Sequence, residues 1–402
     1  MDRQEGRVWI LWVLLVCLFN MGAAAAAAPP APDAAPALKG LQAHPNEFPA
    51  QASTIATAAT NWVRLELIME PDGSLDLARY DDVVDTIRAS GMGVIGLVDY
   101  MTIPEDLDGD GTRDYDDPDD VLAYQQRFVD AVRVLAGHFA GRITRWEIWN
   151  EENGAQWHIR PEYYARLLVL TAAAVRQADP ANQVLFGGLD HAWATSQYLE
   201  PVYDALDRDW AGARPFDILA VHPYFVTRNG QPVLDPKVYL WEVADPARTT
   251  LDKYLATMGA HGDVDVDIWI TEIGWNSALD NPAIEECPLL KPWCVTRAQQ
   301  AEYLRDSFDI LLKEVRDPAG RRDRVGAIVW YQYHDTGSTL AEQAAKMSIP
   351  LETLQLDAQA DLSAACPADW GLVDAARRPK PAYWAYQAYR RAWTVYLPAV
   401  TR

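Results

Sequence analysis

Two glutamates that follow apolar segments are the side chains best placed to do chemistry in this chain. Glu151 comes after residues 143–149 and the amide of Asn150, and Glu272 comes directly after residues 266–271. Both segments are short and rich in β-branched and aromatic residues, which predicts buried strands. A carboxylate at the end of a buried strand is an unusual choice for stability alone. Two of them at one face of a barrel are the equipment for hydrolysing a glycosidic bond.

The elements that would position these carboxylates alternate between strand and helix. The predicted strands are residues 38–43, 62–68, 93–99, 143–149, 183–186, 216–221, 266–271 and 325–331. The predicted helices include residues 51–59, 80–89, 121–139, 162–178, 248–260, 297–315 and 381–393. This alternation indicates a parallel sheet, and eight units indicate a closed (β/α)8 barrel of the α/β class. We expect one domain over residues 38–393, with its working residues at the carboxyl ends of the strands.

The composition allows one large core and excludes two kinds of partner. The chain has 402 residues, 50% of them hydrophobic, and a formal net charge of −22. Such a charge repels nucleic acids and anionic membrane surfaces, and it suits a neutral polymer as substrate. The 16 tryptophans are many for a chain of this length. Some must belong to the core, but flat aromatic rings also stack on sugars.

Both ends of the chain lie outside the predicted barrel. Residues 1–28 have the layout of a secretory signal peptide, with an uncleaved membrane anchor as the alternative. Residues 29–37 form a Pro/Ala-rich tether, and residues 394–402 form a short tail. These features predict a secreted protein, or one tethered at the cell surface.

Three cysteines remain after the predicted signal peptide. Export permits disulfides, and Cys287 and Cys294 are close in a proline-containing loop. We therefore expect a local Cys287–Cys294 bridge, with Cys366 either left free or competing for a partner.

The segments Trp149-Asn150-Glu151 and Thr271-Glu272-Ile273-Gly274-Trp275 resemble the retaining glycoside hydrolases of clan A, most closely family 39 and its relatives. The resemblance runs from about residue 38 to residue 391. It implies a double displacement at a β-glycosidic bond, with Glu151 as acid/base and Glu272 as nucleophile. No cofactor is implied for catalysis, and the partner implied is an oligosaccharide or polysaccharide.

The resemblance also implies roles for residues around the two glutamates. Asn150 would hold the sugar 2-hydroxyl, and Arg64 would keep Glu272 ionised. The alternative for Arg64 is a structural pair with Glu66, which shares its strand face by the two-residue alternation.

Four further residues are expected near the substrate. His222 would contact the sugar and Tyr224 would hydrogen-bond the nucleophile. Trp330 would form the aromatic floor under the sugar, or it would be a core tryptophan. Trp157 would line a sugar subsite, or it would only pack its own loop.

The loop after the third predicted strand carries acidic residues in a calcium-binding register. Its oxygen-bearing positions are Asp106, Asp108, Asp110, Thr112, Asp114 and Asp117, with Gly111 at the sixth position. This register resembles the twelve-residue calcium loops of EF-hands and dockerins, although aspartate replaces glutamate at the twelfth position. We expect a structural Ca²⁺ here, and the alternative is a solvated acidic loop.

Two other functions remain open from the sequence. One is a different clan A glycanase, similar to family 5 or family 10. The other is a noncatalytic, calcium-stabilised carbohydrate-binding barrel. The presence of two strand-end carboxylates argues against the binding protein, which has no need of them.

Overall fold

The computed structural model describes residues 39–43, 48–68, 74–154, 157–190, 196–224, 226–228, 231–240, 246–288, 290–314, 324–335 and 366–393. The predicted signal peptide, tether and tail lie outside these residues. Within the described ranges, no helix is both long enough and apolar enough to cross a membrane.

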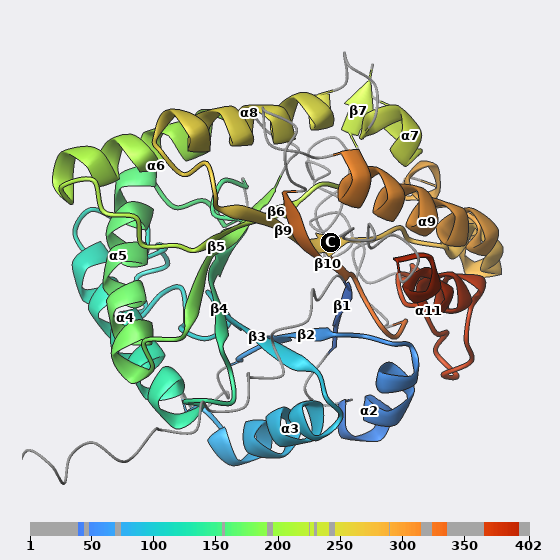
Figure 1. Cartoon of the computed structure of the whole chain (residues 1–402), viewed down its shortest axis with the longest axis horizontal. Helices are drawn as coiled ribbons and strands as arrows, with labels where there is room; N and C mark the ends of the chain where they lie inside the picture. The colour runs from blue at the N-terminus through green and yellow to red at the C-terminus, as the bar shows by residue number, and fades with distance from the viewer. Residues whose placement is uncertain are drawn as a thin grey trace, which may run out of the picture. The chain divides into compact units, whose positions relative to one another are not determined.

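Eight parallel strands close into a barrel, as the sequence predicts (Figure 1). The strands are β1 (Lys39–Gln42), β2 (Trp62–Glu66), β3 (Gly93–Val98), β4 (Arg145–Asn150), β5 (Gln183–Asp190), β6 (Ile218–His222), β9 (Asp267–Ile273) and β10 (Val325–Trp330). Their order around the barrel is β1-β10-β9-β6-β5-β4-β3-β2, so β10 closes the ring by pairing with both β1 and β9. A small antiparallel hairpin, β7 (Val226–Arg228) and β8 (Gln231–Val233), follows β6 and was not predicted.

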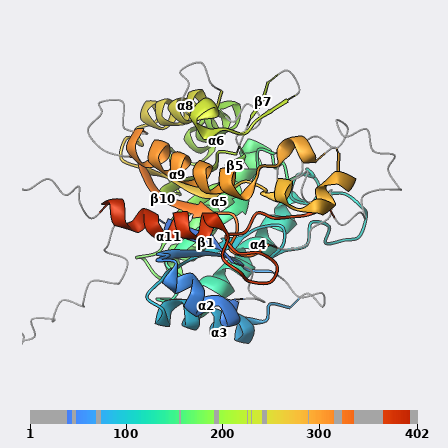
Figure 2. The same cartoon turned by 90° about the vertical axis from the view of Figure 1, so that its right-hand side faces the viewer.

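Helices surround the barrel (Figures 1 and 2). They are α2 (Phe48–Thr57), α3 (Leu77–Ala89), α4 (Val121–His138), α5 (Pro161–Ala178), α6 (Ser196–Asp209), α7 (Pro236–Tyr239), α8 (Pro246–Ala260), α9 (Arg297–Glu314) and α11 (Pro381–Trp393). Local residues define where two of the helices begin. Asp76 caps α3 by accepting from the Arg79 amide, and Pro161 is the first residue of α5. The sequence analysis missed α6, because Pro201 inside it normally interrupts a helix.

The barrel interior is apolar near the amino ends of the strands and polar near their carboxyl ends. Trp62 and Trp269 meet at the apolar end, with ring centroids 5.3 Å apart, in a cluster separate from the outer core. Gly93 makes room for them, because a Cβ there would lie 2.3 Å from the Trp62 ring. Side chains two residues further along a strand point the same way. Arg64 and Thr271 therefore lie one layer closer to the carboxyl ends.

The disulfide links Cys287 to Cys366, so the expected Cys287–Cys294 bridge is wrong. The Cys294 thiol is buried and free, and it donates to the carbonyl of Leu290. Burial raises the pKa of this thiol to about 12, which keeps it unreactive. Short spacing favours a local bridge, but Cys287 and Cys294 end separate 3-10 turns, η3 (Pro282–Glu286) and η4 (Lys291–Trp293). The returning chain brings Cys366 to the first of them.

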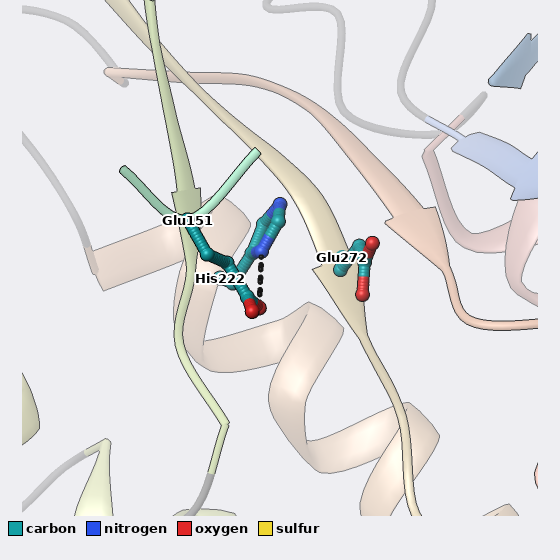
Figure 3. Close-up of side chains that lie close together, drawn as sticks. All are labelled: Glu151, His222 and Glu272. Carbon is teal, nitrogen blue, oxygen red and sulfur yellow. Dashed lines mark hydrogen bonds and ion pairs between the residues drawn. The ribbon is translucent and has the colours of Figure 1, made fainter. Parts of the chain in front are cut away.

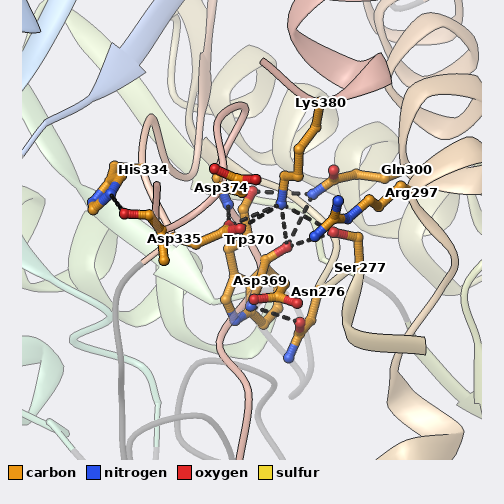
Figure 4. A network of polar contacts seen from close by, with 12 residues as sticks. Asn276, Ser277, Arg297, Gln300, His334, Asp335, Asp369, Trp370, Asp374 and Lys380 are labelled. Atoms are coloured by element: carbon orange, nitrogen blue, oxygen red, sulfur yellow. Dashed lines mark hydrogen bonds and ion pairs between the residues drawn. The ribbon is translucent and has the colours of Figure 1, made fainter. Parts of the chain in front are cut away.

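A buried lysine holds the returning segment, residues 366–380, against the ends of β9 and β10 (Figure 4). Lys380 Nζ donates to the Asp335 carboxylate at 2.8 and 3.0 Å and to Ser277 Oγ at 3.0 Å. It also donates to the carbonyl of Asp369 at 2.9 Å. Burial lowers the pKa of Lys380 and raises that of Asp335 to about 6. The pair ties the returning segment to the residues that follow β9 and β10.

Candidate active site

One buried arginine organises the polar end of the barrel. We call the group that it holds the Arg64 cluster, made of Arg64, Gln42, Glu147, Asn150 and Glu272. Arg64 makes a bidentate salt bridge with Glu147, with N···O distances of 2.7 and 3.0 Å. It donates to Glu272 Oε1 at 2.6 Å, to Gln42 at 2.7 Å and to Asn150 at 2.9 Å. All five N–H donors of the guanidinium are therefore used.

The charge of the arginine is fixed by these contacts. Burial alone would lower the pKa of Arg64, but the carboxylates of Glu147 and Glu272 outweigh burial and raise it. The carboxylate that grips Arg64 is Glu147, and not the Glu66 that strand alternation suggested as an alternative partner. The sequence analysis missed Glu147, which lies three residues before Asn150 on β4 and is fully buried.

Glu272 is held by one cation and one hydroxyl. Arg64 Nη1 contacts its Oε1, and the Tyr224 hydroxyl donates to its Oε2 at 2.9 Å. Burial and the Glu272 charge raise the pKa of Tyr224, so this hydroxyl stays protonated and remains a donor. Both contacts stabilise the ionised form of the carboxylate. The predicted Tyr224–Glu272 contact is present.

Glu151 lies opposite Glu272 and contacts a different partner (Figure 3). His222 Nδ1 lies 3.1 Å from Glu151 Oε1, and His222 Nε2 lies 3.1 Å from Thr271 Oγ1. Thr271 donates its own hydroxyl proton to Glu147 at 2.9 Å, so its oxygen accepts the Nε2–H of His222. A neutral His222 then presents an unprotonated Nδ1, which can accept the proton of the Glu151 acid form.

The two glutamates face each other at short range. Glu151, His222 and Glu272 each contribute a polar atom to a group whose members all lie within 4.8 Å of one another. Three side chains of these types at such distances can hold a metal ion. Here the Arg64 guanidinium already provides a positive charge at 2.6 Å from Glu272, and a divalent ion would repel it. The donor set therefore suits a carboxylate pair better than a metal.

The backbone that presents Glu151 is strained. Trp149 has φ 78° and Glu151 has φ 56°, a region that side chains with a Cβ rarely adopt. Such residues cost on the order of 1–3 kcal/mol each, and they cluster at functional sites. Surrounding contacts hold the turn in place: the Trp149 indole donates to the carbonyl of Trp157, and the Glu151 amide donates to the carbonyl of Gly188.

Two glycines at the end of β5 make room for particular side chains. A Cβ at Gly188 would lie 2.0 Å from His222 Nε2, and a Cβ at Gly187 would lie 2.2 Å from Glu152 Oε2. The sequence suggests only that small residues leave space at the barrel mouth. In the structure, the imidazole and the Glu152 carboxyl fill that space.

Glu152 is a second carboxyl next to the acid/base candidate, in a very different setting. It is completely buried, and neither carboxyl oxygen has a hydrogen-bond partner. Burial raises the pKa of Glu152 well above its ordinary value, with the charges of Glu147 and Glu151 adding to the effect. The raised pKa favours the neutral form of Glu152, so Glu151 is the better candidate for a carboxylate that faces Glu272.

Two of the aromatic side chains expected near the substrate are buried. Trp330 is completely buried, and its indole donates to the carbonyl of Trp370 at 3.3 Å, as a core tryptophan would. Its neighbour Tyr331 is partly exposed, with its ring 6.0 Å from that of Trp370. His222, which was expected to contact the sugar, is also fully buried and contacts Glu151.

Trp157 lies beside the site through an aromatic stack. Its ring is parallel to that of Tyr100, with centroids 3.7 Å apart, and it is partly exposed. The Tyr100 hydroxyl accepts from the Asn150 amide at 3.1 Å. Asn150 accepts from Arg64 through its carbonyl, and its amide group is a donor that can face a sugar hydroxyl. The sequence analysis missed Tyr100, which lies just beyond β3 in a stretch without a motif.

The structure brings together most of the residues expected to bind calcium. Asp106, Asp108 and Asp114 place carboxylate oxygens within 4.8 Å of one another, and Asp108 does the same with Asp110 and Asp120. Thr112 donates its hydroxyl to Asp110. Asp117, the expected twelfth-position ligand, belongs to neither group in the described part of the chain.

The comparisons with known proteins give structural similarity only. No protein-family model matches the sequence, and no curated protein matches it. The structure is similar to a family 39 glycoside hydrolase from the gut symbiont Bacteroides cellulosilyticus WH2, at 17% identity and a TM-score of 0.55. That match covers 87% of this chain but only 62% of the relative, so the chain spans less than two thirds of that enzyme's length.

Two further structures show the same architecture. One is GH5_18 from Streptomyces cattleya in complex with GlcNAc, at 16% identity and a TM-score of 0.57, covering 90% of this chain and 82% of that one. The other is a GH10 endoxylanase from a sugarcane soil metagenome, at 16% identity and a TM-score of 0.54, covering 88% and 97%. The expected resemblance to clan A glycoside hydrolases is thus confirmed for the fold.

Proposed function

We propose that this protein is a glycoside hydrolase that cleaves β-glycosidic bonds of a neutral glycan with retention of configuration. The observation that carries the proposal is the facing pair Glu151 and Glu272, with polar atoms within 4.8 Å. Retaining enzymes hold their two carboxyls about 5–5.5 Å apart, whereas inverting enzymes need about 6.5–9.5 Å to admit a water molecule. The similarity in fold to three glycoside hydrolase families supports the same class of reaction.

The environments of the two carboxyls assign their roles. Glu272, beside the Arg64 cation and the Tyr224 hydroxyl, is kept ionised and serves as the nucleophile. Glu151, beside an imidazole nitrogen that can accept its proton, serves as the acid/base. It also keeps more contact with solvent, at 8% exposed against 1% for Glu272. Access to water suits the group that must exchange its proton in each cycle.

The reaction then runs in two displacements. Glu272 attacks the anomeric carbon while Glu151 gives its proton to the glycosidic oxygen, so the C–O bond to the leaving group breaks and a glycosyl ester forms. Esterification removes the charge of Glu272, and Glu151 is left as a carboxylate. Glu151 next takes a proton from water, whose oxygen displaces Glu272 from the anomeric carbon. Two inversions restore the original configuration.

The test is hydrolysis of a panel of aryl β-glycosides and neutral β-glycans by the full chain, with Glu151→Ala and Glu272→Ala measured in parallel. Glu285→Ala, at an exposed carboxylate on η3, is the control. We expect losses on the order of 10²–10⁴-fold in kcat for Glu151→Ala and a larger loss for Glu272→Ala. Turnover that survives Glu272→Ala would exclude it as the nucleophile.

Two readouts distinguish the proposed catalytic roles from a loss of activity through misfolding. A 2-fluoro glycoside of the substrate sugar should label the peptide that contains Glu272. Azide should restore activity to Glu151→Ala and give a glycosyl azide of retained configuration, because azide needs no base to attack the intermediate. An initial product of inverted configuration would overturn the double displacement. Sugar binding without turnover by the unmutated chain would favour the carbohydrate-binding barrel.

We also propose that the protein is exported by residues 1–28. The Cys287–Cys366 disulfide supports an oxidising compartment. Sequencing the amino terminus of the protein recovered from the culture medium checks this, with a start near residue 29 expected. A membrane-bound chain with an intact amino terminus would instead favour the anchor.

A further inference from the structure

The loop between β3 and α4 gathers carboxylates that the proposed chemistry does not use. We call residues 106–120 the acidic loop. Asp108 belongs to two overlapping groups of oxygens, one with Asp106 and Asp114 and one with Asp110 and Asp120, each within 4.8 Å. Two oxygens bound to one Ca²⁺ lie no more than about 5 Å apart, because each Ca–O distance is about 2.3–2.6 Å. Each group therefore has the dimensions of a calcium coordination shell.

Asp114 provides an independent indication of a cation site. It is buried, at 2% exposed, and its Oδ2 accepts from the Leu107 amide at 2.8 Å. Its Oδ1 is also buried but has no hydrogen-bond partner. A buried carboxylate oxygen without a partner costs free energy, and the nearby carboxylates of Asp106 and Asp108 add repulsion. A cation at this point would satisfy the oxygen and remove the repulsion.

We propose that the acidic loop binds one calcium ion through the carboxylates of Asp106, Asp108, Asp110, Asp114 and Asp120. An all-oxygen set on an irregular loop favours Ca²⁺ over the more rigidly octahedral Mg²⁺.

Asp120 replaces the Asp117 that the twelve-residue register suggests. The Asp117 side chain accepts from the Asp119 amide, whereas Asp120 makes no side-chain cap to α4 and lies with Asp108 and Asp110.

The acidic loop also contacts the segment that follows Glu151. Asp116 accepts from the Arg160 amide at 2.7 Å, and the Arg113 guanidinium lies 5.6 Å from the Trp157 ring centroid. The Tyr115 ring lies 4.9 Å from that of Trp149. A calcium ion that orders the acidic loop would therefore position the strained turn that presents the acid/base candidate. This is a positioning role, and the binding site itself does not depend on the proposed glycosidase activity.

The test begins with the full chain stripped of metal by a chelator. Calcium is titrated by calorimetry, with magnesium as the comparison, and thermal unfolding is followed with and without each ion. Terbium, which takes the same oxygen ligands, gives a second readout, because Tyr115 adjoins the site and can sensitise its luminescence. We expect one calcium per chain, a higher Tm with calcium, and a much smaller effect of magnesium.

Four variants locate the site. Asp108→Asn and Asp120→Asn should each weaken calcium binding about tenfold or more, because fewer ligand charges lower the affinity. Asp119→Asn is the matched control, since it removes the same charge from an exposed position outside both groups. Asp117→Asn tests the ligand set, and it should bind calcium like the unmutated chain.

Three outcomes would overturn the proposal. They are no saturable calcium binding at millimolar concentrations, equal losses in Asp119→Asn and Asp108→Asn, and a loss in Asp117→Asn but not in Asp120→Asn. Circular dichroism confirms that each variant is folded, and Asp108 and Asp119 are both exposed positions where asparagine is tolerated.

Discussion

The Arg64 cluster and the acidic loop both gather negative charge, but they balance it in different ways. In the Arg64 cluster, Glu147 and Glu272 share one buried guanidinium whose five N–H groups are all bonded. In the acidic loop, Asp106 accepts from the amides of Gly109 and Gly111, and Asp114 leaves one buried oxygen without a partner. The cluster has its cation built into the chain. In the acidic loop, Arg113 pairs with Glu105 and Arg160 lies near Asp116, and neither carboxylate belongs to the two groups around Asp108.

This difference separates a permanent part of the site from a conditional one. The geometry of the Arg64 cluster depends only on folding, so it should be the same in any buffer. The geometry of the acidic loop should follow the supply of a cation. Glu152 shows a third solution, because a buried carboxyl with neither cation nor hydrogen bond binds a proton instead.

Removing the built-in cation should have the largest effect. Arg64→Met keeps the volume of the side chain but leaves Glu147 and Glu272 buried without a partner charge. We expect the free energy of unfolding in urea to fall by about 3–5 kcal/mol, and hydrolysis to be lost with it. Calcium should not restore either quantity.

Arg133→Met is the control for this change. Arg133 pairs with Asp130 on the surface of α4, and its loss should change stability by no more than about 0.5 kcal/mol. Equal stability of the two variants would mean that the cluster contributes nothing beyond a surface pair.

The proton on Glu152 predicts a pH-dependent stability. The folded-state pKa is raised, so its contribution is fully present below the unfolded pKa of about 4.3 and is lost as pH rises through the folded pKa. In that window unfolding releases one proton, and stability falls by up to about 1.4 kcal/mol per pH unit. Glu152→Gln removes this slope.

The measurement is urea unfolding of both proteins between pH 4.5 and 7. The stability advantage of Glu152→Gln over the unmutated chain should grow steadily with pH. Glu162→Gln, at an exposed position on α5, should show no such trend. A constant difference between Glu152→Gln and the unmutated chain would show that Glu152 is ionised in the folded state.

The effect of Asp114→Asn on the free energy of unfolding should have opposite signs in chelator and in calcium. In chelator, it removes one of several repelling charges, so stability should stay the same or rise by up to about 1 kcal/mol. At a calcium concentration about 100-fold above Kd, the unmutated chain gains about 2.7 kcal/mol and the variant gains less. Thermal unfolding in both conditions checks this. If Asp114→Asn changed stability equally in chelator and in calcium, the acidic loop would not depend on a cation, and it would not differ from the Arg64 cluster in this respect.

Gly188→Ala tests whether His222 connects Glu151 to the Arg64 cluster through hydrogen bonds. The added Cβ would lie 2.0 Å from His222 Nε2, so the imidazole must shift, and its contacts with Thr271 and Glu151 should be disturbed. We expect kcat to fall about tenfold or more, with a change in its pH profile. Gly137→Ala on α4 is the control, because its Cβ meets nothing within 4 Å, and it should raise stability by up to about 1 kcal/mol. An unchanged pH profile in Gly188→Ala would place His222 outside the proton chemistry.

The sequence predicts the barrel well because the barrel repeats one local signal. All eight predicted strands are present, and most boundaries agree to within two residues. Each strand is a short apolar run between helices, so its identity can be determined without knowing its neighbours. The two facing glutamates could be predicted for the same reason, since the end of a strand fixes the face on which its next residue lies.

The partners of those glutamates depend on contacts across the barrel, which periodicity does not encode. Glu147 looks like any residue inside a strand until Arg64, from β2, is placed against it. The bonded cysteines are 79 residues apart, whereas the predicted pair was close in sequence. In the acidic loop, the register gives Asp117, but the backbone turns into α4 so that Asp120 lies with the other carboxylates.

The Cys287–Cys366 bond changes the connectivity of the molecule. The chain is a covalent ring with two tails, and the ring contains α9 and β10. Because β10 pairs with both β1 and β9, the strand that closes the barrel is carried by the segment that the disulfide closes. A protease that cuts once between residues 288 and 365 would open the ring but leave every strand in one covalent molecule. Reduction after such a cut would divide the chain into two pieces.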